Sequence, residues 1–256
     1  MMLLCMDVGN TNIVLGVFED ELLTHSFRIQ SDPMETPDEY GIKIIEMLRF
    51  FNVEYQKISG VIIASVVPGL DGGFERTFEK FFGIKPIFVS PGTKSGIKIK
   101  IDNPKQLGAD ILVGCVAAHQ KYGSPCIVVD MGTAITFAGL TADKEILGVT
   151  ILPGIKTSYS NLISKTARLE AARMEVPLKV LGRDTVASIQ SGMIFGTASM
   201  IDGMIRRIKK EMGVDKIITV LTGGESRMVR DYLEEPTFYD ENLLLDGLRI
   251  IYQKNL

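Results

Sequence analysis

The sequence predicts an α/β protein of two similar subdomains, each a mixed sheet that begins with a three-stranded antiparallel meander and is flanked by helices. Residues 3–16 and 126–139 repeat one pattern: an apolar run, an Asp, a Gly, a Thr and a second apolar run that ends in Gly. Further apolar runs alternate with segments of helical period. The content of 46% hydrophobic and 23% charged residues is that of a globular protein with a sizeable core.

Each copy of the repeat predicts a β-hairpin whose tip carries a carboxylate, a glycine and small polar side chains. The tips are Asp7-Val8-Gly9-Asn10-Thr11-Asn12 and Asp130-Met131-Gly132-Thr133. Glycine lets an anion approach backbone N–H groups, and an Asp at a strand end can hold a metal ion or a water. Gly223 and Gly224 follow another apolar strand and add a turn where an adenosine would fit. One copy alone is explained by an ordinary hairpin, but the three elements together favour a nucleotide clamp.

The first half is expected to continue from the meander as helix, strand, helix and strand. Thr36-Pro37-Asp38-Glu39 predicts a helix start, because Thr caps a helix and Pro suits its first position. Its buried face is predicted to hold Ile42, Ile45, Leu48 and Phe51. The alternating isoleucines and lysines of 94–101 predict an edge strand, with a phosphate-attracting patch as the alternative. The other expected strands are 22–29, 60–67 and 86–89, and the other expected helices are 70–82 and 106–122.

The second half is expected to repeat the meander and then to become largely helical. Its longest helix contains Gly192 and Gly196, which are four residues apart and allow another backbone to approach, so this helix is a candidate dimer surface. We divide the chain into domains at 1–113 and 114–256. The expected strands are 126–130, 134–140, 145–151, 217–221 and one near 238, and the expected helices are 152–169, 186–212, 226–233 and 242–252.

Composition excludes several classes of function. The net charge of −3 and the lack of a basic patch give no case for nucleic acid. Only two histidines are present, which excludes a His-based metal site or a Ser-His-Asp triad. Cys5, Cys115 and Cys126 are far apart in apolar surroundings and predict buried thiols in a reducing cytosol. Asp7 breaks the first apolar run and no basic region precedes it, so we expect neither a signal peptide nor a membrane segment.

A series of segments spread over the whole chain carries a resemblance to a known family. They are 7–12, 64–68, 102–104, 108–110, 130–134, 151–154, 190–192 and 221–224. With the two tips and the Gly-Gly turn, the chain resembles the superfamily of acetate kinase, sugar kinases, heat-shock chaperones and actin, which have two ribonuclease-H-like domains. The finer resemblance is to the type III pantothenate kinases of bacterial coenzyme A synthesis.

The resemblance implies ATP-dependent phosphorylation of the primary hydroxyl of pantothenate by a cytoplasmic homodimer that needs Mg²⁺ and either K⁺ or NH₄⁺. Asp110 would accept the proton of the hydroxyl, Asp7 would hold Mg²⁺ and Asp130 would bind the monovalent cation. The residues that would contact ATP are Asp7, Val8, Gly9, Asn10, Thr11, Asn12, Ile13, Val14, Thr133, Gly223 and Gly224. Those that would contact pantothenate are Ile101, Gly108, Ala109, Asp110, Ile111 and Thr185, the last of them across the dimer interface.

The sequence departs from the family at two substrate positions. The family usually has an aromatic residue where Ile101 stands and an Arg where Ile111 stands, and the loss of the Arg removes a bidentate partner for a carboxylate. A kinase for another small alcohol is therefore one alternative. A nucleotide-binding regulatory homologue without turnover is another, although the retained carboxylates argue against it. Without the resemblance, Asp110 would be interpreted as an ordinary acid in the first turn of a helix.

Overall fold

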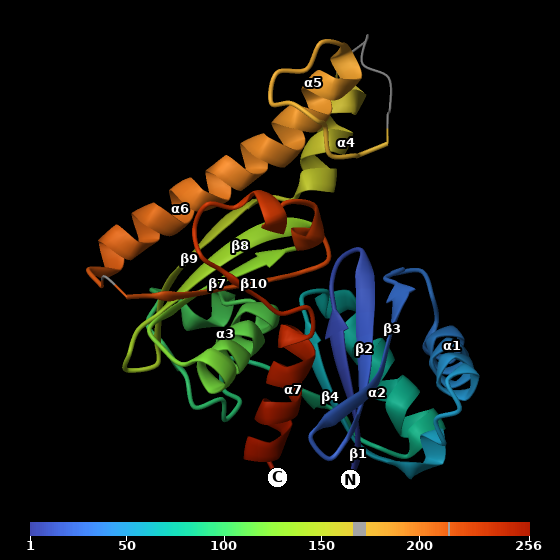
Figure 1. The fold of residues 1–256 in the computed structure, drawn as a ribbon. Helices are drawn as coiled ribbons and strands as arrows, with labels where there is room; N and C mark the ends of the chain where they lie inside the picture. The colour runs from blue at the N-terminus through green and yellow to red at the C-terminus, as the bar shows by residue number, and fades with distance from the viewer. Residues whose placement is uncertain (166–172, 215) are drawn as a thin grey trace. The chain divides into compact units, whose positions relative to one another are not determined.

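The protein, seen in a computed structural model, is described for residues 1–165, 173–214 and 216–256 (Figure 1). Two compact units divide it: 1–117 with 242–256, and 118–241. The helical stretch expected up to residue 169 lies partly outside the described residues. None of the described helices is both long and apolar enough to cross a membrane.

The first unit is built on a sheet with the strand order β3-β2-β1-β4-β5. The strands β1, β2 and β3 form the antiparallel meander, and β4 and β5 continue the sheet in parallel with β1. The two-residue strand β6, which is not part of this sheet, is all of the expected edge strand 94–101 that forms. The bounds are β1 Met2–Val8, β2 Asn12–Glu19, β3 Leu22–Gln30, β4 Ile58–Ser65, β5 Ile87–Phe88 and β6 Lys98–Ile99.

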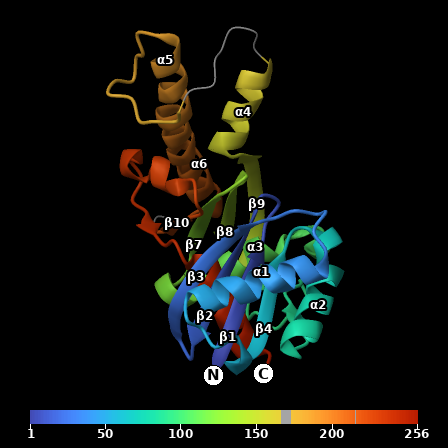
Figure 2. The same cartoon turned by 90° about the vertical axis from the view of Figure 1, so that its right-hand side faces the viewer.

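Helices α1 and α2 cover one face of this sheet, as Figure 2 shows for α1 in front of the strands. Alternate residues of β1, among them Leu4 and Met6, pack with Ile44 of α1 and Phe74 of α2 in one core. The helices are α1 Pro37–Phe50, α2 Pro68–Phe82, α3 Ala109–Tyr122 and α7 Leu243–Lys254, and the short 3₁₀ turns are η1 Tyr55–Lys57 and η2 Pro104–Gln106.

The predicted start of α1 is confirmed, and its predicted buried face is right for Leu48, right in part for Phe51 and wrong for Ile42. Thr36 and Glu39 form a reciprocal capping box, with the Glu39 N–H donating to Thr36 Oγ1 over 3.3 Å. The buried residues are Tyr40, Gly41, Ile44 and Leu48, whereas Ile42 is 52% exposed. The tertiary contacts of Tyr40, whose hydroxyl donates to the Asp32 carbonyl, help to fix which side of the helix faces the sheet.

The C-terminal helix α7 belongs to the first unit. It packs on β1, β2 and β4 through glycines, because a Cβ on Gly60 would lie 2.0 Å from the Tyr252 hydroxyl and one on Gly16 would lie 2.8 Å from Leu245 Cδ1. The domain division at 1–113 and 114–256 stays a prediction. The units of the structure differ from it mainly in this helix, which returns to the sheet that begins the chain.

The second unit repeats the strand pattern of the first. Its sheet contains the order β9-β8-β7-β10-β11, with the meander β7-β8-β9 antiparallel and β10 and β11 parallel to β7. This order matches β3-β2-β1-β4-β5, so the duplication predicted from the two hairpins extends to five strands. The bounds are β7 Cys126–Met131, β8 Ala134–Leu140, β9 Glu145–Pro153, β10 Ile218–Thr222 and β11 Phe238–Tyr239.

The longest helical stretch of the second unit is interrupted. A π-helical segment, η3 Gly192–Gly196, separates α5 Thr185–Ser191 from α6 Thr197–Met212, while α4 Ile155–Lys165 follows β9. Ile194, Ile201 and Ile205 pack with Val129 and Phe137 of the sheet. The helix expected over 226–233 is instead two 3₁₀ turns, η4 Ser226–Met228 and η5 Arg230–Tyr232.

Candidate active site

The first hairpin tip joins β1 to β2 through residues 9–12. Val8 pairs with Ile13 as the last ladder pair, and both side chains are fully buried, so these two residues can meet a ligand only through their backbone. The Gly9 N–H donates to the Asn12 carbonyl over 3.0 Å, which closes the turn. The Thr11 carbonyl accepts from the Ser31 N–H over 3.0 Å, so the tip is anchored to the end of β3.

The polar side chains of this tip are open to solvent. Asn10, Thr11 and Asn12 are exposed, while Asp7 and Val14, which pair with each other across β1 and β2, are partly buried. Asp7 is also opposite Ala64 of the parallel strand β4. The first tip therefore presents one carboxylate near the carboxyl end of β1, beside exposed amide and hydroxyl groups.

The second hairpin tip, between β7 and β8, has the same plan with a shorter loop. Asp130 pairs with Thr136, and Met131 with Ile135. The Gly132 N–H donates to the Ala134 carbonyl over 2.9 Å, and Thr133 is exposed. The carbonyl of Thr133 accepts two hydrogen bonds of 2.9 Å, from the Gly154 N–H and from Thr157 Oγ1 at the start of α4. The start of α4 thereby holds this tip.

The Gly-Gly turn after β10 lies against the second tip. Thr222 pairs with Asp130 across the parallel strands. Gly223 has φ of +90°, and a Cβ there would lie 2.4 Å from Asp130 Oδ1 and 2.4 Å from the Met131 carbonyl oxygen. A glycine is therefore required at this position, both for the backbone conformation and for the close approach. Gly224 is exposed next to it. The structure thus brings Gly223 against Asp130 at the base of the second tip.

Sequence reasoning assigned no role to Glu225, which the structure places beside this tip. Glu225 is 8% exposed, and its Oε2 accepts from the Ile155 N–H at 2.7 Å and the Lys156 N–H at 3.3 Å. Burial raises the pKa of the Glu225 carboxyl, and the two backbone hydrogen bonds oppose that rise. The sequence indicates Glu225 only as an acid directly after the Gly-Gly pair. This position does not reveal that its hydrogen-bond partners are at the start of α4.

Asp110 is the second residue of α3 in the first unit. Its Oδ1 accepts from the Ile111 N–H over 2.8 Å, and a Cβ on Gly108 would lie 2.3 Å from the same oxygen. Burial raises the pKa of the Asp110 carboxyl, while backbone hydrogen bonds from Ile111 and from Asp110 itself lower it. Because the rise from burial is the larger effect, Asp110 is a stronger base than an exposed aspartate. Gly108, Ala109 and Ile111 are partly buried around it.

Two further residues predicted to contact substrate lie elsewhere in the chain. Ile101 is partly buried between β6 and η2. Thr185 is the exposed first residue of α5, where Asp184 caps the helix by accepting from the Ala187 N–H over 2.8 Å. Ser188 Oγ donates to the Asp184 carbonyl over 2.7 Å.

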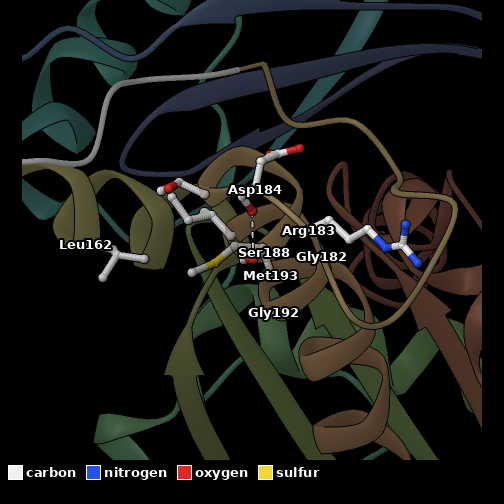
Figure 3. Close-up of a pocket in the computed structure, with 9 residues that line it drawn as sticks. Leu162, Gly182, Arg183, Asp184, Ser188, Gly192 and Met193 are labelled. Carbon is white, nitrogen blue, oxygen red and sulfur yellow. Dashed lines mark hydrogen bonds between the residues drawn. The ribbon is translucent and has the colours of Figure 1, made fainter.

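An open cavity of about 640 Å³ surrounds Thr185. Figure 3 shows Leu162 of α4 and the side chain of Arg183 at opposite ends of the group of lining residues, with Ser188 hydrogen-bonded to Asp184 between them. Gly192 and Met193 of the π-helical segment complete this part of the lining. The cavity thus has apolar and polar side chains around Thr185, the residue whose contact with pantothenate the family resemblance implies.

No group of three or more His, Cys, Asp or Glu side chains in the described ranges is arranged to hold a metal ion. Mg²⁺ in phosphoryl-transfer enzymes is usually held by one or two carboxylates together with phosphates and waters.

Comparisons with solved structures agree with the fold. A protein from Campylobacter jejuni described as a conserved Baf-family transcriptional activator is 21% identical, with a TM-score of 0.60 and 98% of each chain covered. The activator of 2-hydroxyisocaproyl-CoA dehydratase from Clostridium difficile, with bound ADPNP, is 12% identical, with a TM-score of 0.58 and 99% of this chain and 94% of that one covered. Component A of (R)-2-hydroxyglutaryl-CoA dehydratase from Acidaminococcus fermentans is 12% identical, with a TM-score of 0.57 and 98% of this chain and 97% of that one covered. At these identities the likeness concerns the fold alone.

The comparison with protein families is more specific. The family model of type III pantothenate kinase matches residues 3–207, which include both hairpin tips, Asp110 and Thr185. The match covers most of the chain and agrees with the resemblance predicted from the short motifs. With its duplicated sheets and paired Asp-Gly tips, the chain belongs to the type III pantothenate kinase family, the ATP-dependent phosphotransferases that phosphorylate pantothenate in coenzyme A biosynthesis.

Proposed function

We propose that this chain transfers the γ-phosphoryl group of ATP to the primary hydroxyl of pantothenate, using the residues of its two hairpin tips and Asp110. The observation that carries the proposal is the duplicated arrangement, in which the central strand of each sheet delivers an aspartate and a glycine turn near its carboxyl end. The carboxyl ends of parallel strands are where α/β proteins bind their ligands. The family membership supplies the reaction.

The nucleotide would be held by backbone groups and small side chains. Asp7, Asn10, Thr11 and Asn12 offer polar groups at the first tip, and Gly9 allows close approach. Val8 and Ile13 would contribute only their backbone because their side chains are buried. Thr133, Gly223 and Gly224 would also contact the nucleotide. Phosphoryl transfer needs positioning and charge neutralisation more than covalent chemistry, so this set requires no lysine or histidine.

The side chains present also suit the ions that the family resemblance implies. Asp7 would hold Mg²⁺ directly or through water, and Asp130 would hold K⁺ or NH₄⁺. When bound, the ions would neutralise negative charge on the phosphates. Asp130 fits this role because the residue against its carboxylate is Gly223, which has no side chain that would fill the space beside it. The backbones of Gly223 and Met131 lie next to each other at this point.

Asp110 would orient the pantothenate hydroxyl and accept its proton. Its raised pKa favours this role, because a general base is most effective when its pKa is close to the working pH. Gly108, Ala109, Ile111 and Ile101 would line the substrate near this carboxylate. Gly108 fits because any side chain there would displace the Asp110 oxygen.

Thr185 would contact pantothenate from a partner subunit of a cytoplasmic homodimer. The cavity at Thr185 supports this role because it offers hydroxyl groups and apolar walls to a small polar ligand. Gly192 and Gly196 support the dimer, because a Cβ on either glycine would meet nothing within 4 Å and another backbone could approach there.

The deciding experiment offers the purified protein ATP, Mg²⁺ and K⁺ with pantothenate or with a panel of primary alcohols of similar size. Phosphorus NMR identifies the product, and ADP release gives the rate. We expect pantothenate to be the preferred acceptor. Preference for another alcohol would support the alternative function, a kinase for a different small alcohol, which the isoleucines at positions 101 and 111 suggest. ATP binding without transfer to any acceptor would instead indicate a regulatory homologue.

A further inference from the structure

We propose that Glu225 is a positioning residue of the active site, which ties the cation- and nucleotide-binding tip of the second unit to the start of α4 and to the Gly-Gly turn. The inference rests on the proposed roles of Asp130 and Thr133. Glu225 contacts neither the reacting atoms nor, in this proposal, the ligands; it acts through the residues that do.

Glu225 is connected to all three segments that surround the tip. Its backbone N–H donates to the Met131 carbonyl over 2.9 Å, between Asp130 and Gly132. Its carboxylate accepts from the first two backbone N–H groups of α4, those of Ile155 and Lys156. Its own position follows directly after Gly223 and Gly224. One buried residue therefore sets the distance between tip, helix and turn.

The residues packed around the Glu225 carboxylate leave it little room to move. A Cβ on Gly154 would lie 3.0 Å from Glu225 Oε2, 2.1 Å from the Gly132 carbonyl oxygen and 2.8 Å from that of Thr133. The Gly154 N–H also donates to the Thr133 carbonyl. A shift of the Glu225 side chain would therefore move the start of α4 and, with it, the backbone on both sides of Thr133.

A residue that only capped the start of α4 would not need to be a buried glutamate from a distant segment. Ser, Thr, Asn or Asp immediately before a helix usually satisfies its first N–H groups without the cost of burying a charge. Here the acceptor comes from a different segment, and its charge lies at the positive end of the helix dipole. We infer that the Glu225 carboxylate serves to connect the Gly-Gly turn to the start of α4. This connection matters for the site because α4 also contributes Leu162 to the cavity at Thr185.

Asp202 offers a matched control in the same unit. It is 2% exposed, and its two oxygens accept from the Glu234 and Glu235 N–H groups, each at 3.0 Å. It is thus another buried carboxylate that binds two consecutive backbone N–H groups, but those groups belong to the loop after η5. Loss of either carboxylate should reduce stability, and only loss of Glu225 should change ligand binding.

The experiment compares Glu225→Leu, Glu225→Gln and Asp202→Asn with the parent protein. Removal of a group that orients a ligand-binding residue typically weakens affinity about 10- to 100-fold. We expect Glu225→Leu to raise the KM for ATP and the half-activating K⁺ concentration by about tenfold or more, with a change of less than about threefold in the KM for pantothenate. Glu225→Gln, which keeps an acceptor oxygen, should recover most of the loss. Unchanged ATP and K⁺ constants in a folded Glu225→Leu variant would overturn the proposal.

Hydrogen exchange of the ligand-free proteins gives a second readout. In Glu225→Leu the amides of residues 131–134 and 154–158 should exchange faster, while Asp202→Asn should affect the 233–235 loop instead. Equal protection of the tip in all variants would also refute the positioning role. If the parent enzyme itself shows no dependence on K⁺ or NH₄⁺, the assignment of Asp130 fails, whereas faster exchange at the tip would still support the structural link through Glu225.

Discussion

The backbone of Gly223 lies directly against the carboxylate of Asp130, so that a Cβ on the glycine would be 2.4 Å from Asp130 Oδ1. The two residues are at the ends of the neighbouring parallel strands β10 and β7, where Thr222 pairs with Asp130. The contact joins two motifs that are far apart in the sequence. It also makes the Asp130 carboxylate sensitive to any side chain added at position 223.

We expect Gly223→Ala to lower kcat/KM for ATP strongly, because the added methyl group must displace Asp130 or the Met131 backbone. Gly213→Ala is the control: Gly213 also has positive φ, at +64°, but a Cβ there would meet nothing within 4 Å. Both variants should lose about 1–2 kcal/mol of stability from the left-handed backbone. Steady-state kinetics on both separates the two effects, and equal activity of the two variants would contradict the contact as a functional one.

Asp130→Ala should weaken activation by K⁺ or NH₄⁺, because it removes the carboxylate proposed to bind the monovalent cation. Initial rates are measured while either salt replaces a choline salt at constant ionic strength. Asp143→Ala, in the exposed turn between β8 and β9, is the control and should keep the activation of the parent protein. If Asp130→Ala retains the full activation by K⁺, another group binds the cation.

Asp110→Asn should lower kcat by about 10²–10⁴-fold, the usual loss when a general base is removed. Asp38 is a matched control, since it is likewise the second residue of its helix but is exposed and pairs with Lys80. Asp38→Asn should leave kcat unchanged. Circular dichroism confirms that both variants fold. Parent-like turnover in Asp110→Asn would show that Asp110 is only a first-turn helix acid.

The same substitution should change how stability depends on pH. The folded-state pKa of Asp110 is raised above its ordinary value of 3.8. Its favourable contribution is therefore complete below the unfolded pKa and is lost as pH rises through the folded pKa. Asp110→Asn does not ionise, so its melting temperature relative to the parent protein should be higher at about pH 7 than at about pH 4. A difference that is constant over this range would mean that burial does not shift the Asp110 pKa.

Thr185→Val should raise the KM for pantothenate by about 3- to 10-fold, the effect of one lost hydrogen bond, and should leave the KM for ATP unchanged. Thr141→Val provides the control, because the Thr141 hydroxyl oxygen accepts from the Glu145 N–H in a hairpin turn and has no proposed ligand. Calorimetric titration with pantothenate measures the affinity directly. An unchanged affinity would remove Thr185, and the cavity around it, from the substrate site.

Local sequence predicted the strands and the hairpin tips well because their signals are local. Apolar runs, a helix-capping Thr and Gly turns act over a few residues, and the duplication is visible when the two halves are compared. The errors are equally specific. The helix expected over 226–233 is two 3₁₀ turns. In α1, Ile42 is exposed although it was predicted to be buried, and Tyr40 and Ile44 are buried together with the predicted Leu48.

The sequence by itself determined that two hairpin tips with an Asp and a Gly follow buried strands, because apolar runs and glycine turns are local signals. Only the tertiary structure decided that α7 packs on the first sheet, that Gly223 contacts Asp130 and that Glu225 holds the start of α4. It also decided the raised pKa of Asp110. Burial and long-range hydrogen bonds depend on segments distant in the chain, and no local pattern of residues records which segments will meet.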